Sequence, residues 1–329
     1  MNLMHIKYAV EVANEGSINK AAEKLYVGQP NLSRAIKELE ASLGVKIFER
    51  SAKGMGLTSD GETFIRYAKT ILRQVDEVES IFNGSGSVKK RFSISVPRAS
   101  YISDAFARFS HSLTNEAEAE IIYKETNSLR AIKNILHEDY KLGIIRYAEN
   151  YDKYFKTMLD EKDMQYEMIT EFSYVLAMSR DNPLASAEKI TFDALKDYIE
   201  IAHADPYVPS LPLSQVRKEE LPDNIGRRIF VFERASQFEL LSENPETFMW
   251  VSPIPQKLLN RYDLVQIPCE ENKKIYKDIL IYKRDYKLTV LDKAFIDELC
   301  KSKREMFSTK MVDYLKKALI YGHTSRISS

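Results

Sequence analysis

The sequence has few of the residues that build metal sites, disulfide frameworks and nucleotide-binding loops. Its 329 residues include two cysteines, Cys269 and Cys300, which lie far apart, and five scattered histidines. It has no Cys-x-x-Cys pair and no Cys/His cluster, so neither a disulfide framework nor a zinc site is expected. The eleven glycines form no phosphate-binding loop. We therefore expect neither a metal nor a cofactor.

Catalytic signatures are missing as well. The sequence has no Gly-x-Ser-x-Gly elbow, no His-Glu-x-x-His pair and no lysine in a setting typical of Schiff-base chemistry. The chain is therefore not expected to be an enzyme. A DNA-binding domain fused to an enzyme stays open as an alternative, and a catalytic residue set would be its mark.

Long apolar runs are absent too. No stretch approaches the roughly 20 apolar residues that cross a bilayer, and the first residues lack the apolar core of a signal peptide. We expect a cytoplasmic protein with no membrane partner. The 48 Lys and Arg balance the 48 Asp and Glu, so the charge of the whole chain does not point to nucleic acid. Residues 1–90 carry 13 basic and 11 acidic side chains, a small excess of the sign that DNA requires.

Three short helices are predicted before residue 44, because apolar residues recur there at three- and four-residue steps. Ser17 suits the N-cap of the second helix. Pro30 suits the first turn of the third, which runs from Gln29 to about Leu43. After them, residues 45–58 alternate like two short strands around a turn. This order is typical of a winged helix-turn-helix.

The third helix has a polar face that suits DNA, because its apolar stripe lies on the opposite side. Gln29 can pair bidentately with adenine and Arg34 with guanine, whereas Ser17 and Ser33 are placed to hold phosphates. Cations of the wing suit the DNA backbone or the minor groove. The predicted DNA-binding residues are Ser17, Gln29, Pro30, Ser33, Arg34, Lys37, Lys46, Arg50 and Lys53.

These residues resemble the N-terminal domain of LysR-type transcriptional regulators. The pattern is gapless from Gly16-Ser17-Ile18 through Gln29-Pro30 to Leu43-Gly44, and Phe48-Glu49-Arg50 continues it in the wing. The resemblance implies a protein that binds double-stranded promoter DNA as a homodimer or a dimer of dimers. One position departs from the family: Gly28 stands where Ser or Thr usually caps the recognition helix. Glycine caps less well by roughly a few tenths of a kcal/mol, and it offers no hydroxyl to a phosphate.

A long amphipathic helix is predicted over residues 59–82, with Ile71, Val75 and Val78 on its apolar stripe. The stripe exceeds what one small domain would cover, so a dimerising coiled coil is expected, as in the linker helix of the family. Packing on its own domain is the alternative. A Gly/Ser segment then predicts a flexible linker, so residues 59–90 are expected to form a dimerisation helix and a hinge.

Residues 91–303 alternate between predicted strands and helices, which indicates an α/β architecture with mostly parallel sheets. The layout is similar to the two-lobed, periplasmic-binding-protein-like effector domain of LysR-type regulators. By that likeness one lobe comprises about 92–166 plus 267–300, and the other 167–266. The resemblance implies that a small-molecule effector binds in the cleft between them.

Side chains that follow predicted strands are the candidates for the effector site, because the carboxyl ends of strands line the crevice in open α/β sheets. An anionic effector is favoured, since arginine binds carboxylates bidentately. The candidates are Arg98, Ser100, Thr126, Arg146 and His203, with Tyr101, Tyr147 and Phe232 as pocket walls or core residues.

The expected fold is therefore a winged helix-turn-helix (1–58), a linker helix, a two-lobed α/β domain and a helical tail (304–329). The tail has one apolar face, which packs either on the effector domain or in a dimer contact. The segment 242–247 lacks the Gly-x-Gly turn that the family usually has. This departure keeps a second alternative open, a constitutive DNA-binding protein whose C-terminal domain only oligomerises.

Overall fold

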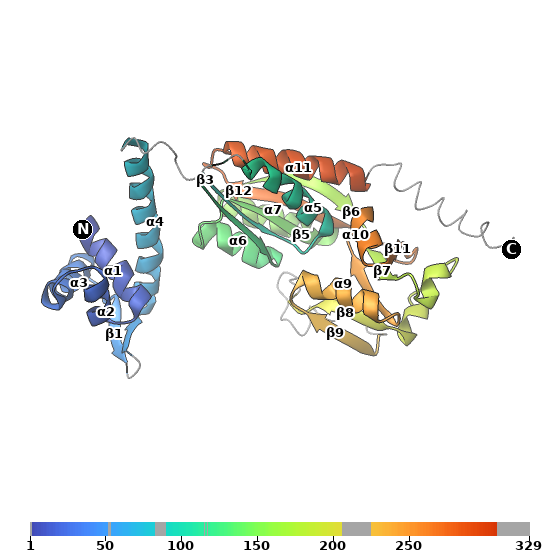
Figure 1. Cartoon of the computed structure of the whole chain (residues 1–329), viewed down its shortest axis with the longest axis horizontal. Coiled ribbons are helices and arrows are strands. Elements are labelled where there is room, and N and C mark those ends of the chain that lie inside the picture. Colours follow the sequence, from blue (N-terminus) through green and yellow to red (C-terminus); the bar gives the residue numbers. More distant parts are fainter. Residues whose placement is uncertain are drawn as a thin grey trace. The chain divides into compact units, whose positions relative to one another are not determined.

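The computed structural model of the chain describes residues 2–51, 54–82, 90–114, 116, 118–205 and 225–307. The chain divides into two compact units, Met1–Lys89 and Lys90–Ser329 (Figure 1). Lys53 of the predicted wing, the predicted linker 83–87 and residues 308–329 of the predicted tail lie outside the described residues. Within the described residues, no helix has the length and apolar character to cross a membrane, and no three metal-ligating side chains form a cluster.

The N-terminal unit has three short helices, a hairpin and one long helix over its described residues. Its elements are α1 (Leu3–Glu15), α2 (Ile18–Lys24), α3 (Gln29–Leu43), β1 (Phe48–Ser51), β2 (Gly54–Leu57) and α4 (Ser59–Phe82). Helices α1 and α3 end at Gly16 and Gly44, whose φ angles are 59° and 72°. Glycine suits these left-handed caps because it has no Cβ. The predicted winged helix-turn-helix is confirmed, although the first wing strand begins at Phe48 rather than at residue 45.

One apolar core holds the helices and the wing of this unit together. Leu32, Ile36 and Leu39 give α3 a buried stripe, which packs with Ala9 and Val12 of α1. Because these residues fix one side of α3 in the core, the polar residues between them are directed to the surface.

Helix α4 begins in close contact with the chain that precedes the wing. A Cβ on Gly61 would lie 2.0 Å from the carbonyl oxygen of Ile47, so only glycine fits at this position. The Thr58 hydroxyl donates to the carbonyl oxygen of Lys46 at 2.5 Å and accepts the N–H of Gly61 at 2.9 Å. The start of α4 is thus fixed to the root of the wing.

Over its described residues, the C-terminal unit contains two lobes, each built on a five-stranded sheet. In lobe 1 the strand order is β4-β3-β5-β12-β6. Its elements are β3 (Lys90–Val96), α5 (Ser100–Phe109), β4 (Ala119–Glu125), α6 (Ser128–His137), β5 (Leu142–Ala148), α7 (Asp152–Glu161), β6 (Met164–Phe172), β12 (Tyr276–Lys283) and α11 (Val290–Phe307). Two 3-10 turns, Ser110–Leu113 and Glu149–Tyr151, extend α5 and precede α7.

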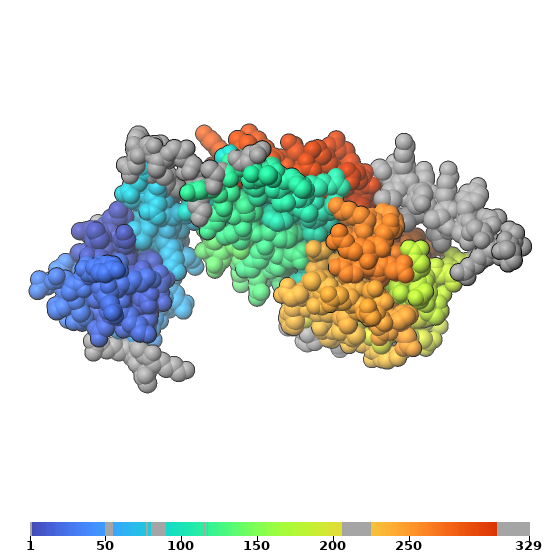
Figure 2. All heavy atoms as spheres, viewed as in Figure 1, coloured from blue at the N-terminus to red at the C-terminus, as the bar shows by residue number. Residues whose placement is uncertain are grey.

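Lobe 2 has the strand order β11-β7-β10-β8-β9. Its elements are β7 (Val175–Ser179), two 3-10 turns (Pro183–Ser186 and Ala194–Asp197), β8 (Ile199–His203), β9 (Arg227–Val231), α9 (Arg234–Glu243), β10 (Thr247–Val251), α10 (Gln256–Arg261) and β11 (Leu264–Ile267). In the space-filling view, the orange residues around α10 lie where lobe 2 meets lobe 1 (Figure 2).

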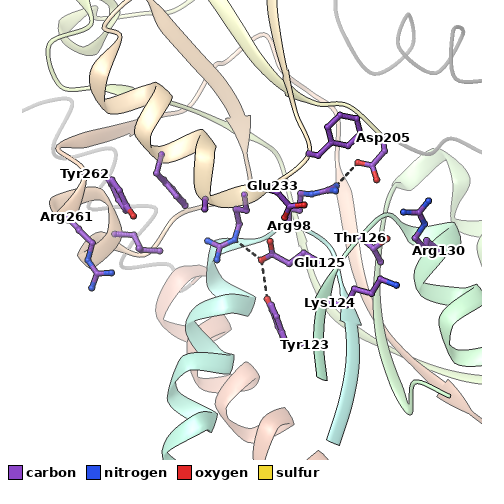
Figure 3. A pocket seen from close by; sticks show the side chains of 15 residues that line it. Arg98, Tyr123, Lys124, Glu125, Thr126, Arg130, Asp205, Glu233, Arg261 and Tyr262 are labelled. Carbon is purple, nitrogen blue, oxygen red and sulfur yellow. Dashed lines mark hydrogen bonds and ion pairs between the residues drawn. The ribbon is translucent and has the colours of Figure 1, made fainter. Parts of the chain in front are cut away.

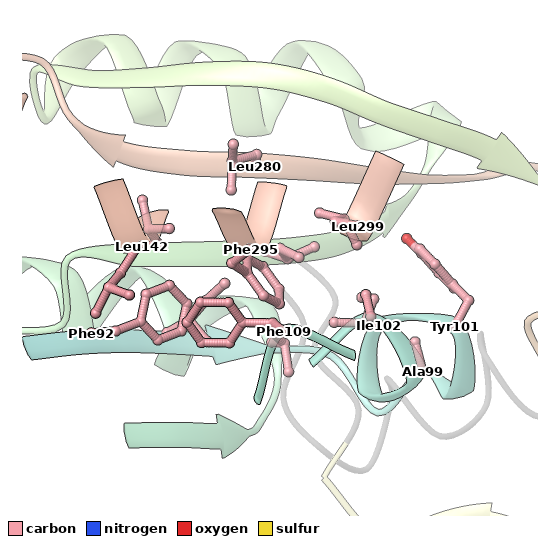
Figure 4. Packing of buried hydrophobic residues seen from close by; sticks show 14 of the residues in the cluster. Phe92, Ala99, Tyr101, Ile102, Phe109, Leu142, Leu280, Phe295 and Leu299 are labelled. Atoms are coloured by element: carbon pink, nitrogen blue, oxygen red, sulfur yellow. The ribbon is translucent and has the colours of Figure 1, made fainter. Parts of the chain in front are cut away.

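Helices cover both faces of the sheet in lobe 1. Phe109 of α5 and Phe295 of α11 pack against Phe92 of β3, with ring centroids 4.8 and 5.3 Å from the Phe92 ring (Figure 4). Helices α6 and α7 cover the opposite face. Strand β12 serves both layers, because Leu280 points into the first and Ile279 into the second, as the alternation of a strand requires.

The two-lobed α/β fold is confirmed, but the prediction of mostly parallel sheets is wrong. Strands β3, β4 and β5 pair in parallel, whereas β12 is antiparallel to both of its neighbours. In lobe 2, β7 is antiparallel to β10 and β11. The antiparallel strands are those at which the chain passes between the lobes, from β6 to β7 and from β11 to β12. These connections contain no crossover helix of the kind that parallel neighbours need.

Candidate functional sites

Helix α3 presents a polar face on the surface of the N-terminal unit. Gln29, Pro30, Arg34 and Lys37 are exposed, and Ser33 is half-buried at the edge of this face. Because the other side of α3 is held in the core, these side chains can meet base edges and phosphates on a fixed scaffold.

Two residues of the turn that leads into α3 affect the end of the helix that is predicted to face DNA. Gly28 is the N-cap of α3 and provides no side-chain hydrogen bond, so the first N–H groups of the helix have no side-chain cap. Tyr26 is 97% exposed and has a φ of 54°, a feature that the sequence analysis did not single out. Ser17 caps α2 and accepts the N–H of Lys20 at 3.5 Å, so it has a structural role beside its predicted phosphate contact.

The root of the wing is held by a buried carboxylate. Glu40, at the end of α3, is 7% exposed and accepts the N–H groups of Ile47 and Phe48 at 2.9 and 3.1 Å. Lys46 forms an ion pair with it at 2.9 Å. Burial raises the pKa of Glu40, but Lys46 and the two N–H groups more than offset this, so its pKa lies below the ordinary value. Lys46 thus anchors the wing as well as giving it charge.

The remaining residues of interest in this unit lie in the wing and in α4. Arg50 belongs to β1, but its side chain, like Lys53, is outside the described residues. On α4, Ile71 and Val75 are half-buried and Val78 is 54% exposed. The predicted stripe of α4 is therefore only partly covered.

A cleft of about 790 Å³ lies between the two lobes of the C-terminal unit (Figure 3). Its volume is in the range of small-molecule sites. Arg98 and Thr126 follow β3 and β4 of lobe 1, and Asp205 and Phe232 follow β8 and β9 of lobe 2. All four strands run parallel to a neighbour, so their carboxyl ends converge on the cleft.

Basic side chains predominate in the lining of this cleft. Among the described residues, three acidic side chains line it, Glu125, Asp205 and Glu233, against five basic ones, so two positive charges are in excess. The basic residues are Arg98, Lys124, Arg130, Arg234 and Arg261.

An apolar wall completes the cleft in lobe 2. The rings of Phe238 and Tyr262 stack with centroids 5.0 Å apart, and Leu258 and Phe232 lie in the same lining. The Arg234 guanidinium lies 5.7 Å from the centroid of the Phe238 ring. The cleft thus combines cationic groups with an apolar surface, which suits a small anion with an apolar part.

Comparisons with known proteins agree with this architecture. Residues 3–62 match the family model "Bacterial regulatory helix-turn-helix protein, lysR family". The HTH-type transcriptional regulator AlsR of Bacillus subtilis is 24% identical over 246 residues, which cover 73% of this chain and 76% of AlsR. BenM of Acinetobacter baylyi is 40% identical over 94 residues, 29% of this chain and 31% of BenM. Residues 3–62 therefore form a helix-turn-helix domain of the lysR family, and the chain as a whole is similar to bacterial transcriptional regulators.

Solved structures share the LysR-type fold over almost the whole chain. Full-length CbnR in complex with its target DNA has a TM-score of 0.58 at 19% identity, covering 92% of this chain and 100% of CbnR. Full-length OxyR of Pseudomonas aeruginosa has a TM-score of 0.55 at 16% identity, covering 93% of this chain and 96% of that one. At such identities the likeness shows the fold alone.

Three of the eight predicted effector-site residues line the inter-lobe cleft: Arg98, Thr126 and Phe232. The other five lie outside its lining. Ser100 is 4% exposed in the first turn of α5. The Tyr147 ring stacks on Phe155 with centroids 4.3 Å apart in the core of lobe 1.

Arg146 and Tyr101 form a buried network with a residue that the sequence did not single out, Asp278 of β12. Arg146 donates two hydrogen bonds to the Asp278 carboxylate, at 2.7 Å each, and the Tyr101 hydroxyl donates a third at 2.5 Å. Asp278 and Tyr101 are fully buried. Burial and the nearby carboxylate raise the pKa of Tyr101 well above its ordinary value. This geometry favours a structural role for Arg146 and Tyr101 within lobe 1.

His203 lies at the end of β8, next to the cleft. Burial and the positive charge of Arg98 lower its pKa to about 3, so the imidazole is neutral at physiological pH. Among the described residues, its Nδ1 atom is buried without a hydrogen-bond partner. His203 therefore contributes no charge to the cleft.

Several basic residues of the cleft were not predicted from the sequence, for different reasons. Lys124 is the residue before the last one of β4, and Arg234 begins α9 just after β9, so the strand-end criterion could have found both. Arg130 lies on α6 and Arg261 ends α10. Nothing in the local sequence marks those two, because only the packing of the lobes brings them to the cleft.

Proposed function

We propose that this LysR-type protein regulates transcription by binding promoter DNA through α3 and the wing. The observation that carries the proposal is the exposed polar face of α3, on a helix whose other side is fixed in the core of a lysR-family domain. Gln29 and Arg34 read base edges, and Ser33 and the wing cations hold phosphates. The similar CbnR, solved with its target DNA, supports this role.

The inter-lobe cleft is the proposed site for a small anionic effector. The excess of two positive charges among its described residues, its apolar wall and its volume of about 790 Å³ support this assignment. LysG of Corynebacterium glutamicum, whose fold is similar with a TM-score of 0.56, was solved with its effector Arg bound. A constitutive protein whose C-terminal unit only oligomerises would show no ligand-dependent stabilisation, which a thermal-shift screen measures.

The partly exposed stripe of α4 is the proposed dimer seam, in a homodimer or a dimer of dimers. A two-fold arrangement would place two copies of α3 on two half-sites of the DNA. Since the relatives named above are transcription regulators, we propose a protein without enzymatic activity that acts on the chromosome in the cytoplasm.

Selection from a random DNA library by the purified full-length chain tests the DNA-binding proposal. We expect an enriched motif with two-fold symmetry. Gln29→Ala should relax the preference at one position of each half-site and cost about 1–3 kcal/mol on the specific site. Lys153→Ala, which removes an exposed lysine of α7 in the other unit, serves as the control and should change nothing. Equal losses on specific and random DNA for Gln29→Ala would contradict base readout by this residue.

A further inference from the structure

Three ion pairs among the described residues join the two lobes. Each combines one residue of lobe 1 with one of lobe 2: Arg98 with Asp205, Glu125 with Arg234, and Asp104 with Lys257. Figure 3 shows the Arg98–Asp205 pair in the cleft itself, and Glu125 and Arg234 belong to the same lining. Anything that breaks one of these pairs therefore changes how firmly the lobes are held together.

The Arg98–Asp205 pair lies in the lining of the cleft. The Arg98 Nη1 and Asp205 Oδ1 atoms are 2.8 Å apart, and the side chains are 12% and 24% exposed. The backbone carbonyl of Asp205 accepts a hydrogen bond from the Asn127 side chain at 3.2 Å, so the backbone has a contact of its own with lobe 1. The Asp205 carboxylate could therefore leave Arg98 and return to water while the backbone contact remains.

A second group in the cleft lacks a partner. The Thr126 hydroxyl is buried and makes no hydrogen bond with any described residue, and its side chain lines the same cavity as Arg98. A buried hydroxyl without a partner is costly, so this site favours a ligand that can hydrogen-bond with it.

The rest of the cleft attracts an anion as well. Lys124, Arg130 and Arg261 have no carboxylate within ion-pair distance among the described residues, whereas Arg98 is already paired. An anion that enters will thus meet an attractive field, but on Arg98 it must compete with Asp205.

We infer that the effector binds by exchange: its anionic group takes the place of the Asp205 carboxylate on Arg98 and accepts a hydrogen bond from the Thr126 hydroxyl. Binding then breaks an ion pair that joins the lobes. This inference rests on the proposed function of the cleft. The exchange adds to that function that the ligand releases one inter-lobe contact as it binds. The ligand therefore has a different affinity for tightly held and for loosely held lobes.

The test is calorimetric titration of the full-length chain with phenylacetate, with the neutral phenylacetamide and with inorganic phosphate. Phenylacetate and phosphate represent a carboxylate with an apolar part and a free inorganic anion. Asp205→Asn should tighten anion binding, because it removes the competitor, and Glu233→Gln is the matched control. Both variants remove one negative charge from the cleft lining, but Glu233 has no ion-pair partner among the described residues.

Exchange predicts that Asp205→Asn binds the better anion about fivefold more tightly than Glu233→Gln does, which corresponds to one weak ion pair. Arg98→Met should weaken binding at least tenfold, and Thr126→Val about fivefold. Circular dichroism checks that each variant is folded, and Arg98→Lys, which keeps the charge but not the fork, should give an intermediate loss.

If the Asp205→Asn and Glu233→Gln variants bind the anion with equal affinity, the exchange is wrong. The cleft would then attract anions only through its net charge. Binding of phenylacetamide as tight as that of phenylacetate, or no binding of either anion to any of these proteins, would overturn the exchange too. Titration of the same preparations with DNA keeps the outcomes distinguishable. A chain that binds DNA specifically while the two variants behave alike contradicts only the exchange, whereas a chain without specific DNA binding contradicts the proposed function.

Discussion

Asp278 is the buried carboxylate of lobe 1 whose charge is compensated from two sides. Its side chain is fully buried, and it accepts two hydrogen bonds of 2.7 Å from Arg146 and one of 2.5 Å from Tyr101. Asp278→Asn preserves the size of the side chain but leaves the Arg146 guanidinium, which is 9% exposed, without an anion. The variant thus tests whether this network stabilises the C-terminal unit.

The expected loss follows from the burial of the pair. Removing one partner of a buried ion pair costs about 3–5 kcal/mol, because the other charge stays buried and uncompensated. The Arg146 guanidinium also lies 4.6 Å from the centroid of the Phe172 ring, and this cation–π contact persists in the variant. We therefore expect a loss of about 3–4 kcal/mol in the free energy of unfolding, a large share of what a typical domain has.

Urea unfolding of the full-length chain, followed by circular dichroism, measures this loss. Trp250, the only tryptophan, lies in β10, so its fluorescence reports whether lobe 2 unfolds together with lobe 1. Glu270→Gln is the matched control, since it makes the same carboxylate-to-amide change in an exposed ion pair with Lys189 and should alter little. Unfolding midpoints that are equal for Asp278→Asn and Glu270→Gln would refute the reasoning.

Three further predictions concern other parts of the chain. Gly61→Ala would place a methyl group 2.0 Å from the carbonyl oxygen of Ile47, so we expect the N-terminal unit to lose about 2 kcal/mol or more of stability, measured by urea unfolding. His203 is neutral in the folded state, where burial and a neighbouring arginine lower its pKa to about 3. Its contribution to stability is therefore complete above the pKa of about 6.5 in the unfolded chain and is lost as the pH falls from there toward 3. His203→Gln should flatten this part of the stability profile, and an unchanged acid slope in the variant would show that other groups cause it. Ile71→Glu with Val75→Glu should split the dimer and weaken binding to two-fold symmetric DNA; a variant that stays dimeric by light scattering would place the seam elsewhere.

The helical part of the fold was accessible from the sequence because local signals agreed with the global packing. In the N-terminal unit, the apolar stripe of α3, the Ser17 cap of α2 and the glycines that end α1 and α3 all point to the same boundaries. The direction of the strands could not be predicted from such local signals. Whether β12 runs parallel or antiparallel to β5 depends on the path of the chain between the lobes, and the residues of β12 themselves do not record it.

The effector site, too, could be predicted only in part from the sequence. The strand-end criterion selects the correct edge of the sheet, which is why Arg98 and Thr126 line the cleft. It does not select the direction of each side chain. Arg146 was expected to follow a strand, but it lies within β5 (Leu142–Ala148), and its guanidinium is bound to Asp278, a residue far away in sequence that no local pattern connects with it. An arginine near a predicted strand end therefore indicates a ligand site only when no buried carboxylate of the neighbouring strand is within its reach.

The strength of the inter-lobe contacts limits what any effector can do in this chain. A ligand shifts an equilibrium between two arrangements only by its difference in affinity for them. If anion binding releases the partly buried Arg98–Asp205 pair, worth about 1 kcal/mol, it can bias the lobes by roughly fivefold, at the lower end of typical coupling free energies. The pairs Glu125–Arg234 and Asp104–Lys257 would still hold the lobes together. The structure is thus consistent with a graded adjustment of the lobes rather than their separation, and a larger response would require that the ligand disturb a second pair.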